Sequence, residues 1–406
     1  MDKTLLTQNA LTSKETKHYK RDVAFLFVVI FAYLLCVVPK AGGLPQYMRY
    51  VILPLFIIAA YLRVGIKMRM DFLTVVLFIF AVVPSILFSP YRTNALVKAI
   101  TVLLMFVGVS LYFSSRENFG LSALYRALLF IGYVVVLVSI FSYVSGQGFH
   151  GGYFRGYFGN RNAAGPTFVI TGMIFLAEMF RRKGYKKILP LIFFVLDVFM
   201  TIETQSRGSF VGLIIGLVVF LFFAYKKKAR FIAIVGVLLI LVTIFWGRIS
   251  EWGVVKRILE DGLTRDDLWN EARRIIKNNF FVGVGFSSSA FSNQSAGNEN
   301  MNFHNSYVSL MADIGLFGVI CVALIFILLF IKIAKNYKRV KKEERLCYVA
   351  FLAIALAFFG LSFGESYLIV AGSPFSFIFW CIMFCMSEYV PKRLKKKKQK
   401  EKLNGK

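Results

Sequence analysis

His304 is the residue in this sequence best suited to acid–base chemistry. It is the last residue of a polar stretch, residues 248–304, and a long apolar run that opens with the polar residues 305–307 follows it. The chain has 3 histidines, the others being His18 and His150. Because imidazole titrates near neutral pH, a histidine at such a boundary can serve as a general base for a hydroxyl group. The plainer alternative is a histidine that caps the next helix.

Four arginines, Arg155, Arg161, Arg207 and Arg265, occur in separate polar segments. The planar guanidinium group binds phosphate oxygens in pairs and keeps its proton. Arg265 follows Thr264, which begins a capping-box pattern, so it falls in a first helical turn, where a cation opposes the helix dipole. An anion bound at that helix end would offset this repulsion. We therefore expect the arginines to converge on an anion, and we favour a diphosphate.

Each arginine also has a simpler explanation. Arg207 lies four residues after Glu203 and could form an ion pair within one helix. Arg155 and Arg161 could bind lipid headgroups, and Arg265 could be solvated. No Asp-x-Asp pair and no cluster of histidine with carboxylates occurs in these loops, so we predict no metal site and no cofactor.

The elements that must position these residues are membrane helices. The chain is 58% hydrophobic and 17% aromatic, with a mean hydropathy of +0.66, which is more than a soluble core requires. Apolar runs of about 20 residues are typical of transmembrane helices, and their length excludes barrel strands. We predict an all-α polytopic membrane protein with about 12 transmembrane helices, at 23–38, 50–66, 72–89, 95–114, 122–145, 163–181, 187–203, 208–225, 230–247, 305–332, 346–364 and 368–390.

These spans divide the chain into five parts. A polar tail at residues 1–22, expected to be disordered, precedes spans one to nine in residues 23–247. One long extracytoplasmic loop, residues 248–304, separates them from spans ten to twelve in residues 305–390. A second basic tail occupies residues 391–406.

Two patterns predict local packing. Residues 264–279 are expected to form an amphipathic helix that lies along the outer membrane surface, with one apolar face made of Leu268, Ala272, Ile275 and Ile276. Glycines four residues apart predict a close approach of helices. They form two ladders, one of Gly208, Gly212 and Gly216 and one of Gly360 and Gly364.

Asp197 and Asp313 lie within spans, where we expect structural pairing.

The net charge of +28 reflects membrane topology rather than nucleic-acid binding. Lys and Arg are concentrated in alternate loops, and this bias indicates the cytoplasmic side. Both termini are therefore predicted to be cytoplasmic. The extracytoplasmic segments are then 39–49, 90–94, 146–162, 204–207, 248–304 and 365–367. The basic tail after Pro391 would lie against anionic lipid headgroups.

A group of motifs resembles the conserved core of the O-antigen ligase and polymerase family. The likeness covers about residues 155–320, and the segments that carry it are Gly262 to Trp269, Phe281 to Gly285, His304-Asn305-Ser306-Tyr307, Asp313-Ile314-Gly315 and Gly318. Residues 155–162 and Ser206-Arg207-Gly208 are similar to upstream elements of the same family.

The resemblance implies a metal-independent, inverting glycosyltransferase in the bacterial cytoplasmic (inner) membrane, with its active site on the outer side. Its donor would be a glycan on undecaprenyl diphosphate and its acceptor a glycan or lipid-linked glycan. By position, Arg207 and Arg265 would hold the diphosphate, and His304 would activate the acceptor hydroxyl. Residues assigned to substrate binding are Arg155, Arg161, Asn162 and Asn305. Arg161 departs from the small or proline residue expected between two asparagines.

Several functions stay open at this point. A polymerase joins repeat units on the lipid carrier, whereas a ligase moves a finished glycan to lipid A-core or another acceptor; we favour the polymerase slightly. A lipid-linked sugar flippase or transporter would place charged residues along a central cavity, with broken helices and inverted repeats. A structural scaffold would leave the clustering of Arg207, Arg265 and His304 unexplained.

Overall fold

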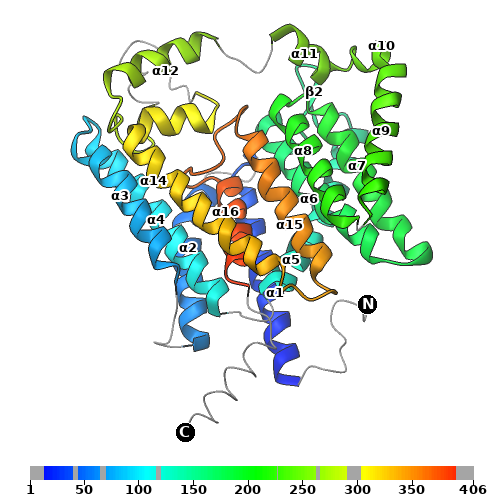
Figure 1. Ribbon diagram of the computed structural model, residues 1–406, viewed down its shortest axis with the longest axis horizontal. Helices are drawn as coiled ribbons and strands as arrows, with labels where there is room; N and C mark the ends of the chain where they lie inside the picture. The colour runs from blue at the N-terminus through cyan, green and yellow to red at the C-terminus, as the bar shows by residue number, and fades with distance from the viewer. Residues whose placement is uncertain are drawn as a thin grey trace.

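The computed structural model is a bundle of helices with one short hairpin (Figure 1). It describes residues 13–39, 44–64, 70–115, 120–225, 227–261, 266–289 and 303–389. Within these residues the strands are β1 (Phe149–His150) and β2 (Tyr153–Phe154), which pair antiparallel with Phe149 opposite Phe154.

Every expected span overlaps a helix. The nine helices before the long loop are α1 (Ser13–Leu35), α2 (Leu44–Val64), α3 (Phe72–Leu87), α4 (Arg92–Ser115), α5 (Gly120–Val144), α6 (Arg161–Arg181), α7 (Ile188–Glu203), α8 (Arg207–Ala224) and α9 (Lys228–Ile244). Those after it are α14 (Ser306–Tyr337), α15 (Arg345–Leu361) and α16 (Pro374–Ser387). The 3-10 helix η4 (Gly184–Lys187) precedes α7.

Length and hydropathy qualify five of the described helices as membrane spans, namely α4, α5, α6, α8 and α14. Shorter apolar helices accompany them at α2, α3, α15 and α16. The protein is therefore an all-α membrane protein, while the number of twelve crossings stays a prediction.

Two helices differ from the expected spans. Helix α1 begins at Ser13, so the prediction of a disordered tail is wrong for residues 13–22. Asp22 in this added stretch is bound by Arg63, with Nη1 and Oδ2 2.6 Å apart, which gives the polar turns a tertiary contact. Helix α14 is broken at Gly315, whose φ of 62° is not helical.

The break in α14 is filled by the end of the long loop. A Cβ on Gly315 would lie 2.5 Å from the carbonyl carbon of Phe281, and one on Gly283 would lie 2.4 Å from that of Asp313. Both glycines have positive φ, so no other residue fits easily. The amide of Gly285 donates to the carbonyl of Asp313 at 3.0 Å. The Gly-Val-Gly and Asp-Ile-Gly motifs are thus the two halves of one backbone clasp.

The described part of the long loop, with the two residues before it, contains α10 (Trp246–Ile249), α11 (Gly253–Asp261) and α12 (Asp266–Asn278). Helix α12 confirms the predicted amphipathic helix, but its apolar face does not lie on the membrane. Ala272 and Ile275 are buried against Val284, Phe303 and Ala312. Protein atoms therefore cover that face, and the proposed Thr264 cap lies outside the described residues.

The glycine ladders do allow a close approach of helices, as predicted, and the structure shows that the two ladders pack against each other. A Cβ on Gly208 would lie 3.0 Å from the carbonyl oxygen of Leu361, and one on Gly364 would lie 3.1 Å from the Cα of Gly208. Helices α8 and α15 therefore touch along their backbones. This contact brings the beginning of α8 next to the end of α15.

The polar segments meet at the end of the bundle that carries α10, α11 and α12, which we call the loop end (Figure 1). There the amide of Gly159 donates to Val37 O at 2.8 Å. Ser89 Oγ donates to Val284 O at 2.6 Å. Segments expected on one side of the membrane thus meet, while the identity of that side stays a prediction.

Candidate active site

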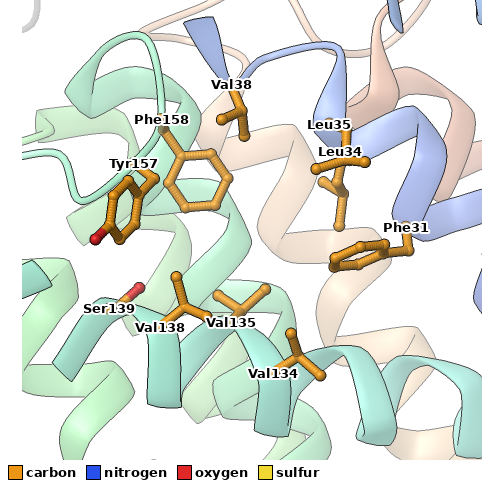
Figure 2. A pocket seen from close by; sticks show the side chains of 10 residues that line it. All are labelled: Phe31, Leu34, Leu35, Val38, Val134, Val135, Val138, Ser139, Tyr157 and Phe158. Carbon is orange, nitrogen blue, oxygen red and sulfur yellow. The ribbon is translucent and has the colours of Figure 1, made fainter. Parts of the chain in front are cut away.

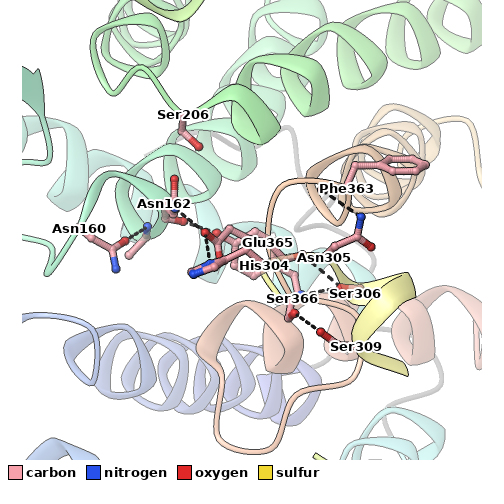
Figure 3. A network of polar contacts seen from close by, with 12 residues as sticks. Asn160, Asn162, Ser206, His304, Asn305, Ser306, Ser309, Phe363, Glu365 and Ser366 are labelled. Carbon is pink, nitrogen blue, oxygen red and sulfur yellow. Dashed lines mark hydrogen bonds and ion pairs between the residues drawn. The ribbon is translucent and has the colours of Figure 1, made fainter. Parts of the chain in front are cut away.

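The centre of the site is a contact between His304 and Glu365 at the loop end (Figure 3). His304 Nδ1 lies 2.7 Å from Glu365 Oε1 and 2.8 Å from Oε2. The imidazole precedes α14, and the carboxylate lies in the segment 362–373, between α15 and α16. The side chains are 30% and 17% exposed, so the pair is partly shielded but still within reach of a substrate.

This contact determines which ring nitrogen of His304 carries the hydrogen and which has a free lone pair. An ionised carboxylate only accepts hydrogen bonds, so Nδ1 must carry the hydrogen. In neutral imidazole the lone pair is then on Nε2, which can take a proton from a hydroxyl group. Glu365 would also stabilise the imidazolium that forms, as the carboxylate does in a Ser-His-Asp triad.

Asn162 holds the carboxylate from the opposite side. Its Nδ2 donates to Glu365 Oε1, and the hydroxyl of Tyr367 donates to the backbone oxygen of Asn162. Asn162 lies in the first turn of α6, which begins after the N-cap Asn160. Helix α6, the 362–373 segment and the start of α14 therefore meet at this one carboxylate.

The 362–373 segment is tied to α14 and α16. Ser306 Oγ accepts from the amide of Tyr367 at 2.9 Å, and the amide of Ser306 donates to Ser362 O at 2.9 Å. Trp380, fully buried in α16, donates from Nε1 to Leu368 O at 2.7 Å. These bonds limit how far the Glu365 backbone can move.

The backbone of His304 is held in an unusual conformation. Its φ is +48°, in the left-handed region that residues with a Cβ rarely occupy. Among the described residues, the other non-glycine examples are Gln205 (+51°) and Ser287 (+54°). Both lie at the loop end, and Gln205 Nε2 donates to Gly152 O there. Such strain persists where the surroundings enforce it, which is frequent at functional sites.

A polar cleft adjoins the pair. It has a volume of about 510 Å³, and Asn162, Glu365 and Tyr367 line it. A smaller cavity of about 90 Å³ is also lined by Glu365, and half of its ten lining residues are serines. Ser309 and Ser366, which line it, are 3.1 Å apart through their hydroxyl oxygens. Glu365 thus lines both an open cleft and a hydroxyl-lined cavity.

Arg207 begins α8 beside this centre. Its neighbour Gly208 lies against Gly364, which precedes Glu365 in the chain. Glu203 is the last residue of α7, so an ion pair within one helix does not explain Arg207. Helix packing therefore places the start of α8 beside the His304 partner.

Arg155 and Arg161 support the loop before α6. Arg155 Nη1 donates to Gly159 O at 3.0 Å. The guanidinium carbon of Arg161 lies 4.5 Å from the centre of the Tyr153 ring. In this structure both arginines contact their own segment, and their binding of substrate stays a prediction.

The remaining sequence candidates differ in their placement. Arg265 lies outside the described residues. Asn305 is 3% exposed, and its Oδ1 accepts from the amides of Tyr307 and Val308 at 2.9 and 3.1 Å. Its Nδ2 donates to Phe363 O at 3.3 Å. Asn305 thus caps α14 and fixes the residue after His304.

The two carboxylates within spans behave differently. Asp313 Oδ1 accepts from the amides of Ser288 and Ser289 at 3.1 and 2.9 Å, so backbone amides bind this carboxylate, where an arginine was expected. Neither oxygen of Asp197 has a hydrogen-bond partner among the described residues, although structural pairing was expected. No group of three or more His, Cys, Asp or Glu side chains placed to hold a metal occurs in the described ranges.

Glu365 is the residue that sequence reasoning missed. It lies in the short segment 365–367, already expected on the same side as His304. A carboxylate between two apolar spans needs a partner or water, and this signal could have identified it.

Comparison with known protein families gives a match over part of the chain. Residues 192–323, from α7 into α14, match the family described as O-antigen ligase. The matched stretch includes both Arg207 and His304. No curated protein matches the chain. This match agrees with the resemblance of the motifs and supports the assignment of the chain to the O-antigen ligase and polymerase family.

Proposed function

We propose that the chain transfers or polymerises glycan units carried on undecaprenyl diphosphate, at the outer face of the bacterial cytoplasmic membrane. Membrane glycan ligase or polymerase activity in general follows from the family. The observation that carries the finer proposal is the contact of His304 Nδ1 with both oxygens of Glu365 beside a polar cleft. This contact leaves Nε2 of the imidazole as the base.

The proposed reaction is a single displacement. The acceptor hydroxyl attacks the anomeric carbon of the donor, and its proton passes to His304 Nε2. The bond between the acceptor oxygen and that carbon forms as the bond to the diphosphate oxygen breaks. The diphosphate leaves with the electron pair, and the configuration at carbon inverts. Glu365 stabilises the imidazolium during this step.

Arginines would stabilise the departing diphosphate. Arg207 is the supported candidate, because the contact of Gly208 with Gly364 brings the start of α8 beside the Glu365 segment. Arg265 is proposed from the sequence motif alone. Guanidinium groups aimed at developing negative charge act most strongly where water is excluded. This scheme assigns no step to a metal ion.

The break in α14 does not favour a transporter. Broken helices in transporters expose backbone groups to a bound ion or substrate. Here the amide of Leu316 donates to Phe280 O at 2.8 Å, and Val284 N donates to Ala312 O at 3.0 Å. The break therefore binds the end of the long loop.

A deletion strain complemented with variants tests the proposal. His304→Ala is expected to lower product formation by about 10²–10⁴-fold, the usual contribution of a general base. His150→Ala is the matched control, because His150 is exposed in β1, which pairs with β2 at the same end of the bundle, and it has no such carboxylate contact among the described residues. Membrane levels of both variants are measured by quantitative blotting.

The accumulated glycan identifies the reaction. Single repeat units attached to the acceptor indicate a lost polymerase, the result that we expect. Full-length polymer left on undecaprenyl diphosphate indicates a lost ligase. Donor lipid accumulating on the cytoplasmic face, or full product with His304→Ala, would refute the glycosyltransferase assignment.

A further inference from the structure

An apolar groove lies between α1 and α5 at the loop end (Figure 2). It has a volume of about 270 Å³. One wall comes from α1 and the residues after it, including Leu35 and Val38, and the other wall comes from α5, including Val138. The aromatic side chains of Tyr157 and Phe158, in the loop before α6, close the groove. Val138 is 44% exposed, so the groove is open along α5.

The groove and the polar cleft share one narrow wall. Leu35 and Val38 line the groove, whereas Cys36 and Val37 between them line the cleft. The hydrogen bond from Gly159 N to Val37 O fastens this wall to the loop before α6. A molecule with an apolar chain in the groove can therefore extend its polar end around this wall into the cleft that Glu365 lines.

The junction carries positive charge. Tyr157 and Phe158 close the groove, and Arg155 and Arg161 flank them in the same loop. Arg155 Nη1 donates to Gly159 O, next to the shared wall residue Val37, and Arg161 lies over Tyr153 in β2 of the same loop. Guanidinium groups at this place complement a phosphate ester between the apolar chain and the polar end.

We propose that this groove binds the isoprenoid chain of the lipid diphosphate donor, with the diphosphate at the 155–161 loop and the sugar in the cleft. The inference rests on the proposed function and extends it, because it names where the lipid lies and on which side the donor enters. The residues involved take no part in proton transfer. Chain binding and chemistry can therefore be separated by experiment.

Photocrosslinking tests the groove without turnover. The probe is a diazirine-bearing polyprenyl diphosphate that carries no sugar, added to the full-length protein in nanodiscs. We expect labelled peptides within residues 31–38 or 134–139, and at least fivefold less labelling of these peptides in Val138→Trp, which fills the groove. Leu137→Trp is the control, because Leu137 is 57% exposed on the same helix but does not line the groove.

A second variant protects the test against misfolding. Leu35→Trp fills the groove from the α1 side and should lower labelling similarly, while both variants elute as monodisperse protein. Normal labelling in both tryptophan variants, or labelling confined to other peptides, overturns the proposal that the groove binds the isoprenoid chain. Equal labelling of the groove by a diazirine phosphatidylglycerol at the same mole fraction would also overturn it. His304→Ala should label like wild type, so failure of the catalytic assignment and failure of the groove give different results.

Discussion

Replacing Glu365 by Gln should slow glycan transfer by about 30-fold, which corresponds to a loss of roughly 2 kcal/mol in the transition state. The starting point is the Coulomb attraction of about 4 kcal/mol between unit charges 4 Å apart at an effective dielectric constant near 20. Glu365 contacts His304 Nδ1 at 2.7 and 2.8 Å, and glutamine keeps its volume but removes its charge. Because the side chains are 30% and 17% exposed, we expect about half of this attraction, roughly 2 kcal/mol, to be lost in the transition state.

The assay is the initial rate of glycan transfer by purified protein in nanodiscs, at saturating donor and acceptor. A pair of further variants separates a positioning role from a general loss of structure. Glu365→Asp keeps the charge and should retain more activity than Glu365→Gln. If Glu365 acts through the imidazole, Glu365→Gln should cost nothing further in a His304→Ala background.

Two results would refute this reasoning. A wild-type rate for Glu365→Gln would show that the carboxylate does not assist the base. Independent losses that multiply in the double variant would show that Glu365 acts elsewhere, for example through Asn162 and the cleft.

Three further predictions concern the surroundings of this pair. Asn162→Ala removes the donor to Glu365 and should lower the rate about tenfold, as expected for one hydrogen bond to a charged group, with membrane levels unchanged on a blot. Arg207→Ala should lower the rate by on the order of 10²-fold and Arg207→Lys by less, because lysine keeps the charge but loses the fork; equal losses in the same transfer assay would count against bidentate binding. Gly283→Ala should destabilise the protein by about 1–3 kcal/mol, because a Cβ would lie 2.4 Å from the α14 backbone at a φ of +71°. Thermal unfolding measures this cost, and Gly236→Ala, which has nothing within 4 Å, should cause no such loss.

Local patterns in the sequence were sufficient for much of the architecture. Long apolar runs locate the helices because a chain in lipid must satisfy its backbone groups within each span. The four-residue spacing of Gly208 and Gly212 predicted a close helix contact, and α8 does meet α15 there. The order of the spans also brought the polar loops to one end, because successive helices run in opposite directions.

Other features depend on contacts between distant parts of the chain. The sequence suggested that α12 lies on lipid, but it contains no information on which surface covers an apolar face. Phe303 and Ala312 cover it in the fold. The apolar run around Gly315 likewise predicted a continuous helix. The break at Gly315 depends on its backbone contact with residues 281–282, which the sequence does not indicate.

The candidate site shows the same division. Residue type and position nominated His304 as a candidate base, because the chain has 3 histidines and this one ends a polar loop at the start of an apolar span. Only the tertiary structure decided its partner. Glu365 is 61 residues away and Asn162 is 203 residues from Glu365, so no sequence spacing relates them. Packing of α6, α8, α14 and α15 brings them together, and the resulting hydrogen bond selects which nitrogen of His304 can act as the base.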